Sequence, residues 1–141
     1  MDERLRKIFA DTKAVLAKED YAVANIKASK ISYNYNFFNK VKPFGIICRE
    51  NMATAVCDAK NVLFLKTLGA DVVYPYKLIV FEAKLPFDLT GYLAEISRIL
   101  AENKIPILAF SAYYTDYLLV KKKHSKKAVS ALRSFFSSCK K

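Results

Sequence analysis

The stretch that decides the fold is Lys84–Val120, KLPFDLTGYLAEISRILAENKIPILAFSAYYTDYLLV. It contains the end of one strand, a helix with a glycine near its start and two further strands, with few residues between them. The helical part begins near Asp88, where apolar residues start to recur every three or four positions. Asp88 or Thr90 can cap the first turn, and Asn103 followed by Pro106 marks the end of the helix.

Strands are predicted on both sides of this helix. Lys77–Ala83 is β-branched and aromatic and ends before Pro86, which lacks the amide hydrogen that a sheet ladder needs. Ile105–Ala112 and Thr115–Lys122 are joined by two residues, which predicts antiparallel neighbours. A second helix follows, and Ser125 can cap it. The order strand, helix, strand, strand, helix predicts a ferredoxin-like split βαβ unit, with helices on one face of an antiparallel sheet.

This C-terminal unit lacks a fourth strand, because only five residues follow Phe136. Proteins rarely leave a strand edge with unpaired backbone groups bare in solution. We therefore expect another part of the chain to cover this edge, or a second subunit to pair with it, and we expect a homodimer.

The residues before Lys77 repeat the same order in outline. Asp2–Glu19 is predicted as an amphipathic helix, Ser29–Lys42 as a short helix or turn packed on the sheet, and 61–68 as a short helix capped by Asn61. Strands are predicted at 21–28, 45–50, 54–60 and 71–76. The predicted class is α+β, with ferredoxin-like units in tandem: an N-terminal amphipathic helix at 1–20, a first, divergent unit at 21–76 and a second unit at 77–141 without a final strand of its own.

The residues from Phe87 to Val120 resemble the small tandem ACT-domain proteins. That family has an aspartate shortly before a helix-opening glycine, then a strand that ends in serine, then a strand that begins with a TDY-like motif, and Asp88, Gly91, Ser111 and Asp116 match this pattern. The resemblance implies a non-catalytic regulatory or sensor protein that binds an amino acid at the junction of two ACT units. The cytosolic arginine sensor of animal cells is built from related pairs, but where arginine-sensing relatives tend to have threonine after the serine, this chain has Ala112.

The start of the helix also suggests a ligand on physical grounds. Unpaired amides attract a carboxylate, and Gly91 has no side chain to keep a ligand away. Asp116 or Asp88 can accept hydrogen bonds from an ammonium group, so an α-amino acid would satisfy both ends. In the family that the chain resembles, the ligand contacts this loop, the second strand and the turn after it, which implies the ligand-binding residues Asp88, Leu89, Thr90, Gly91, Ser111, Ala112, Tyr113, Thr115 and Asp116. Structural roles stay open: Asp88 can cap the helix, Gly91 can serve close packing and Asp116 can make a turn hydrogen bond.

Other chemistry has little support in the sequence. Cys48, Cys57 and Cys139 have neither CxxC spacing nor an even count, so we expect two buried strand thiols and one tail thiol, with no disulfide and no metal site. His124 lies in the basic run KKKHSKK without a partner arranged for catalysis. We therefore predict no enzyme activity and no cofactor. The apolar runs are far shorter than the ~20 residues of a membrane span, and no signal-peptide region is visible, so we expect a cytoplasmic protein without a membrane partner.

The net charge of +11 is concentrated near the C-terminus, where lysines follow Asp116, the last acidic residue. We expect these lysines to form mainly a solvated surface. The alternative is a basic adaptor that binds nucleic acid or an acidic protein through its C-terminal helix. A scaffold whose ligand site has decayed is a third reading. For the leading reading, the expected partners are an amino-acid ligand, a second copy of the chain and an enzyme or regulator that responds to the ligand.

Overall fold

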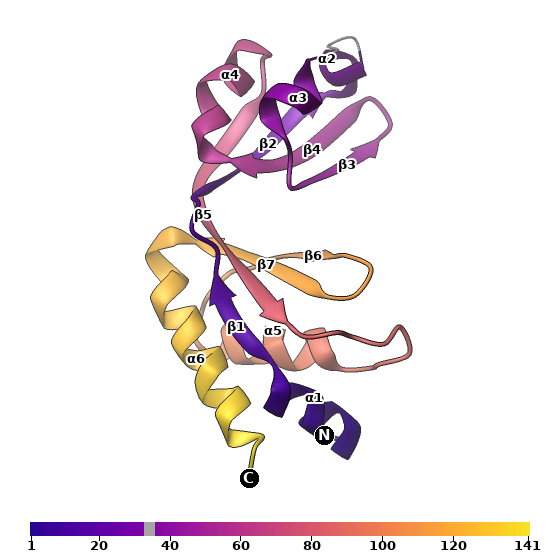
Figure 1. Ribbon diagram of the computed structural model, residues 1–141. Helices are drawn as coiled ribbons and strands as arrows, with labels where there is room; N and C mark the ends of the chain where they lie inside the picture. Colours follow the sequence, from indigo (N-terminus) through magenta and orange to yellow (C-terminus); the bar gives the residue numbers. More distant parts are fainter. Residues whose placement is uncertain (33–35) are drawn as a thin grey trace. The chain divides into compact units, whose positions relative to one another are not determined.

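The computed structural model describes residues 1–32 and 36–141 (Figure 1). Tyr33 and Tyr35 of the predicted aromatic connection lie outside the described residues. The chain forms two compact units: unit 1 comprises Met1–Lys18 and Lys77–Lys141, and unit 2 comprises Glu19–Tyr76. The N-terminal segment is therefore grouped with the C-terminal segment, whereas the sequence-based division sets 1–20 apart.

Unit 1 contains α1 (Glu3–Asp11), β1 (Lys13–Leu16), the second part of β5 (Asp71–Glu82), α5 (Tyr92–Glu102), β6 (Leu108–Ser111), β7 (Asp116–Lys121), the 3-10 turn η2 (Lys122–His124) and α6 (Ser125–Ser138). Its strand order is β1–β5–β7–β6, and β1 pairs antiparallel with β5 as β6 does with β7. Helices α5 and α6 pack on the sheet through one apolar cluster (Figure 1). The predicted cap at Ser125 is wrong, because its hydroxyl donates to the Lys122 carbonyl at 2.8 Å.

Strand β1 corrects the predicted N-terminal helix. The helix ends at Asp11, and Thr12 is already extended, with φ −79° and ψ 138°. The Thr12 hydroxyl donates to the Ile8 carbonyl at 2.7 Å, which closes the last helical turn. Residues 13–16 then pair with residues 82–79 of β5. Pairing to a distant strand therefore overrides the local helical spacing, and β1 supplies the fourth strand that the C-terminal segment lacks.

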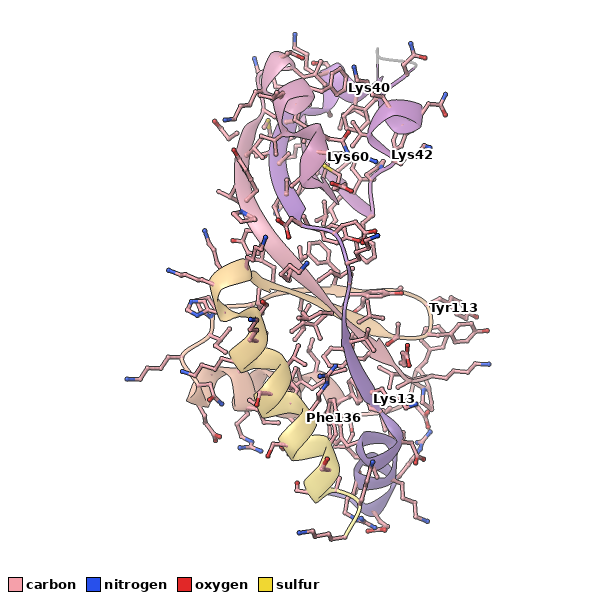
Figure 2. The ribbon with its side chains drawn as sticks, turned by 60° about the vertical axis from the view of Figure 1, so that its left-hand side comes forward. Lys13, Lys40, Lys42, Lys60, Tyr113 and Phe136 are labelled. Carbon is pink, nitrogen blue, oxygen red and sulfur yellow. The ribbon has the colours of Figure 1, made fainter. Side chains whose placement is uncertain are left out.

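Helix α1 covers the core of unit 1 with an aromatic side chain. Phe9 is fully buried and stacks on Tyr92 with ring centroids 4.8 Å apart. It also meets Phe135 at 5.0 Å and Phe136 at 5.7 Å. Phe136 lies on α6 beside β1, close to Lys13 in the view of Figure 2. The N-terminal segment is thus part of this core.

Unit 2 contains β2 (Tyr21–Lys27), α2 (Ala28–Ser32), α3 (Phe37–Val41), β3 (Gly45–Arg49), β4 (Met52–Asp58), the 3-10 turn η1 (Ala59–Asn61), α4 (Val62–Thr67) and the first part of β5. Its strand order is β3–β4–β2–β5, and β2 pairs antiparallel with both neighbours. Small buried residues of the sheet, Ala24, Ala53 and Ala55, leave room for Phe37 and Leu65 from the helices. The predicted short helix of the aromatic segment is α3, which buries Phe37.

The two units share one strand order. In unit 2 we number the strands β2, β3, β4 and β5 from first to fourth. In unit 1 we number them β5, β6, β7 and then β1. With this numbering, the strands of both sheets lie side by side in the order second, third, first, fourth. This is the ferredoxin-like arrangement, so the predicted α+β class with split βαβ units is confirmed. The predicted strands 71–76 and 77–83 are one continuous strand, β5, in which Pro75 stands near the change from pairing with β2 to pairing with β1.

The cysteines differ from the expectation. Cys48 on the edge strand β3 is exposed, whereas Cys57 and the tail residue Cys139 are buried. All three are free thiols. Within residues 1–32 and 36–141, no group of three or more His, Cys, Asp or Glu side chains is placed to hold a metal ion. In the same part of the chain, no helix is both long enough and apolar enough to cross a membrane.

Candidate ligand-binding site

A pocket of about 400 Å³ lies at the start of α5 in unit 1. Three segments form it: the loop after β5, the first turn of α5 and the turn between β6 and β7. The lining residues are Leu85, Pro86, Phe87, Leu89, Gly91, Tyr92, Leu93, Ala94, Ser111, Ala112, Tyr113, Tyr114, Thr115 and Asp116. Tyr113 stands at the tip of the β6–β7 turn and extends outward (Figure 2).

The structure brings seven of the nine expected site residues to this pocket: Leu89, Gly91, Ser111, Ala112, Tyr113, Thr115 and Asp116. Asp88 and Thr90 are not among the lining residues. The spacing in the sequence therefore places most of the expected residues together, although their binding of a ligand stays a prediction.

The residues of the first turn of α5 line the pocket, and their amides have no acceptor within the helix. The first helical hydrogen bond runs from the Glu95 amide to the Gly91 carbonyl at 3.1 Å. The amides of Tyr92, Leu93 and Ala94 therefore have no acceptor within the helix, and all three residues line the pocket. The predicted capping by Asp88 or Thr90 is wrong, because the N-cap is Gly91 and no side chain caps this helix. Such an end attracts an anion.

Gly91 serves the packing of α1. Its φ of +90° is unfavourable for residues with a side chain, and a Cβ there would lie 3.2 Å from Cδ2 of Leu5. Leu5 is buried on α1. The close contact at Gly91 is thus with a helix of the same unit.

Asp88 forms an ion pair with Arg4 of the same helix, α1. Its carboxylate accepts two hydrogen bonds from the Arg4 guanidinium, at 3.1 and 3.0 Å. These bonds lower the pKa of the Asp88 carboxyl below its ordinary value. The pair is largely exposed, so it contributes little to stability, and its observable effect is to direct the Asp88 carboxylate to α1.

Asp116 is the acidic group of the pocket. The Ser111 hydroxyl donates to Oδ1 of Asp116 at 2.5 Å, and the two residues are direct partners across β6 and β7. The Thr115 hydroxyl donates instead to the Phe81 carbonyl at 3.1 Å. A carboxylate can accept several hydrogen bonds, so Asp116 retains capacity for an ammonium group.

An aromatic rim, formed by Phe87, Tyr113 and Tyr114, borders the pocket and was only partly expected. Phe87 and Tyr113 meet edge to face at 4.9 Å, and Tyr113 and Tyr114 at 4.7 Å. The Leu85 amide donates to the Tyr114 carbonyl at 2.7 Å, which ties the two loops together. More than half of each rim side chain is exposed. Of these three residues only Tyr113 is among the expected ligand-binding residues, and the signal in the sequence for the other two is the aromatic side chain in each loop.

Tyr92 is the first residue of α5 and also lines the pocket. It is buried, and its hydroxyl donates to the Thr12 hydroxyl at 3.4 Å. Burial raises the pKa of Tyr92 to about 12, so the phenol stays neutral.

The order of strands defines a ferredoxin-like unit, and its pocket lies at the start of a helix. Residues 75–134 match the ACT domain family. This match covers most of the C-terminal segment of unit 1, including the pocket at the start of α5, and agrees with the resemblance to ACT-domain proteins. A comparison with curated proteins found no match.

Solved structures share the fold over most of the chain. A protein of unknown function from Vibrio cholerae, described as a possible transport protein, aligns with a TM-score of 0.75 at 20% identity over 94% of this chain and 95% of its own. A putative C-terminal regulatory domain of aspartate kinase from Porphyromonas gingivalis aligns with a TM-score of 0.65 at 17% identity, over 90% of this chain and 98% of its own. The regulatory subunit of aspartate kinase from Thermus thermophilus, in a ligand-free form, aligns with a TM-score of 0.66 at 12% identity, over 87% of this chain and 96% of its own. These identities show a common fold.

Proposed function

We propose that this chain is a non-catalytic ACT-domain regulator that binds a free α-amino acid in the pocket at the start of α5. One observation carries the proposal: the residues of the first turn, whose amides lack an acceptor in the helix, and Asp116 line the same cavity. The amides suit the ligand carboxylate, and Asp116 suits its ammonium group. The ligand side chain would then extend toward the aromatic rim.

The comparisons support a regulatory role. ACT domains typically bind small amino-acid ligands and regulate partner enzymes, and two of the similar structures are regulatory parts of aspartate kinases. These matches are to regulatory domains, which favours the absence of a catalytic activity in this chain. We propose that the bound amino acid changes the affinity of the protein for an enzyme or regulator.

The proposal also includes assembly. All residues that line the pocket belong to unit 1. Edge strands β3 and β6 carry unpaired backbone groups along one side, which favours a homodimer through strand edges. Light scattering tests this part: a mass near twice the 16.0 kDa of the chain supports the dimer, and a monomer at high concentration contradicts it.

Binding of each of the twenty amino acids is tested by thermal shift and then by calorimetry on the full chain. We expect at least one to raise the melting temperature, and Asp116→Asn to weaken its binding by about tenfold or more, because the ammonium group loses its charged acceptor. Asp11→Asn is the matched control, since Asp11 is exposed and lies outside the pocket. No response to any amino acid, or equal affinity in Asp116→Asn, contradicts the proposal.

A second candidate function rests on charge. Unit 1 has 17 Lys and Arg residues against 8 Asp and Glu, and exposed lysines 121–123, 126 and 127 gather around η2 and the start of α6. This surface suits a nucleic-acid backbone or an acidic protein. Retardation of nucleic acid that falls steeply with salt, and is lost when lysines 123, 126 and 127 are changed to Gln, would favour it over the amino-acid proposal.

A further inference from the structure

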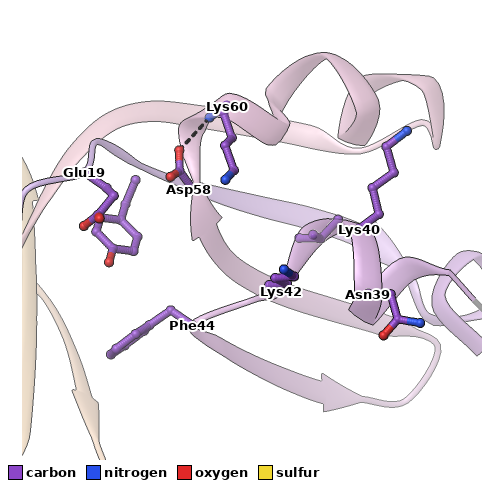
Figure 3. Close-up of a pocket in the computed structure, with 9 residues that line it drawn as sticks. Glu19, Asn39, Lys40, Lys42, Phe44, Asp58 and Lys60 are labelled. Carbon is purple, nitrogen blue, oxygen red and sulfur yellow. Dashed lines mark hydrogen bonds between the residues drawn. The ribbon is translucent and has the colours of Figure 1, made fainter.

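A second pocket of about 400 Å³ lies entirely within unit 2 (Figure 3). It lies where α3 ends, β3 begins and η1 follows β4. Its lining residues are Glu19, Tyr21, Asn39, Lys40, Val41, Lys42, Phe44, Asp58 and Lys60. Its volume falls within the usual range for small-molecule sites, about 300–1,000 Å³.

A buried side chain fixes the geometry of this pocket. Asn61 is 6% exposed, and its amide nitrogen donates to the carbonyls of Val41 and Asp58, each at 3.2 Å. Val41 immediately precedes Lys42, and Asn61 immediately follows Lys60. Asn61 therefore cross-links the two segments that bear these lysines, which are far apart in the sequence. The neighbouring Phe44 is held by its amide, which donates to the Val56 carbonyl at 2.7 Å.

Two of the three lysines belong to one end of the pocket. Lys42 follows α3 and Lys60 lies in η1; the two lie near each other in the view of Figure 3, whereas Lys40 extends away from them. The Lys40 ammonium is placed over the Phe64 ring at 4.2 Å. Among residues 1–32 and 36–141, no ion pair involves Lys42 or Lys60. Both lysines line the same pocket, and two ammonium groups that make no ion pair attract an anion.

Lys42 is the C-cap of α3. It has φ +48° and ψ 60°, a left-handed conformation that commonly ends helices, and its amide donates to the Phe38 carbonyl. This end of α3 brings Lys42 to the pocket.

The other end of the pocket has aromatic and acidic groups. Phe44 is 38% exposed, and its ring meets Tyr21 edge to face at 6.1 Å. Glu19 and Asp58 line the pocket together with Tyr21, and Asp58 is the cross-strand partner of Tyr21. Burial raises the pKa of Tyr21, and the charges of Glu19 and Asp58 raise it further. Asp58 also accepts from the Lys60 amide at 2.9 Å, which fixes its position.

We propose that this pocket binds a nucleoside monophosphate. The phosphate would lie between the ammonium groups of Lys42 and Lys60, because lysine binds phosphate as a point charge. The base would contact the Phe44 ring, and Glu19 or Asp58 would accept hydrogen bonds from the ribose hydroxyls, as carboxylates do in dinucleotide sites. The two units of the chain would then bind ligands of different chemistry, an amino acid in unit 1 and a nucleotide in unit 2.

Calorimetry on the full chain with AMP, GMP, CMP and UMP tests this proposal. We expect saturable binding of at least one, and a loss of about tenfold or more in affinity in the double variant Lys42→Gln, Lys60→Gln, because the phosphate loses both charged donors. The matched control is Lys27→Gln, Lys30→Gln, which removes the same charge from exposed lysines of unit 2 outside the pocket. Circular dichroism shows whether each variant is folded, and amide chemical shifts of Lys42, Phe44 and Lys60 should move on binding.

Three results would overturn the proposal: no binding of any of the four nucleotides, an equal loss in the control variant, or inorganic phosphate binding as tightly as the nucleotides. In a folded Phe44→Leu variant we expect weaker nucleotide binding, and unchanged affinity would also overturn it. The Asp116→Asn variant should bind the nucleotide normally. The two pockets can therefore fail or succeed independently.

Discussion

Units 1 and 2 have the same strand order but obtain their fourth strand in different ways. In unit 2 the fourth strand is the first part of β5, which follows α4 directly in the chain. In unit 1 it is β1, which precedes all the other strands of the chain. The units also differ in charge, with 17 basic and 8 acidic residues in unit 1 against 7 and 5 in unit 2. One topology can therefore be completed from either end of the sequence.

The largest expected effect comes from removing this N-terminal strand. Deletion of residues 1–18 should leave unit 1 without cooperative unfolding, because β5 loses its pairing with β1 and the core loses Phe9. A circular permutant that begins at Glu19 and joins Lys141 to Met1 through a short linker should fold, since Arg6 Nη1 already lies 3.2 Å from the Lys141 carbonyl. Thermal unfolding followed by circular dichroism compares the two. A deletion variant as stable as the full chain would contradict the role of β1.

The aromatic contact of α1 is the next largest effect. Phe9→Ala should lower the free energy of unfolding by about 3–5 kcal/mol, because it leaves a cavity beside Tyr92 and Phe136. Phe38→Ala in unit 2 is the control, since this side chain is 52% exposed and should change stability far less. Urea unfolding of the full chain measures both. Similar losses in the two variants would mean that α1 does not complete the core.

The glycines separate backbone strain from contact with α1. Gly91→Ala should cost about 1–3 kcal/mol, because φ is +90° and the new Cβ meets Leu5. Gly69 has a similar φ of +77°, but a Cβ there would meet no other atom within 4 Å, so Gly69→Ala measures the backbone strain alone. Gly45→Ala has neither and should be nearly neutral. If Gly91→Ala and Gly69→Ala cost the same in urea unfolding, the contact with Leu5 contributes nothing.

The smallest effect concerns alkaline pH in unit 2. Burial raises the pKa of Cys57 from 9.0 to about 11, so between these values the unfolded chain has lost the proton that the folded chain retains. The stability should then fall as pH rises, by about 1 kcal/mol per pH unit from this group. Urea unfolding at pH 8 to 11 measures the slope. Cys57→Ala should reduce it, and the exposed Cys48→Ala should leave it unchanged; equal slopes in all three proteins would contradict this assignment.

Local patterns in the sequence were enough for the elements that depend on neighbouring residues. The helical spacing up to Glu102 and the paired strands after it predict α5, β6 and β7 within a few residues. The same patterns place Gly91, Ser111 and Asp116 around one end of the sheet, where the pocket lies.

Features that depend on distant partners were not predicted from local patterns. The apolar residues near Val15 fit a helix, but their pairing with β5 makes them a strand. Asp88 has the composition of a cap, yet its partner is Arg4, 84 positions away. Asn61 was predicted to cap α4, but its side chain makes no cap and instead joins Val41 to Asp58. The pocket of unit 2 depends on this contact between residues that are distant in the sequence, so no local motif predicted it.

The pairing of β1 with β5 also sets an order of events while the chain is being synthesised. Residues 13–16 are made early, but their partners at 79–82 follow only after the whole of unit 2. Unit 2 has every strand it needs once Tyr76 has been made, so it can fold while β1 and the apolar face of α1 still lack their partners. During that interval Leu5 and Phe9 lack the core that buries them in the folded protein, which leaves the N-terminal segment open to association with other chains.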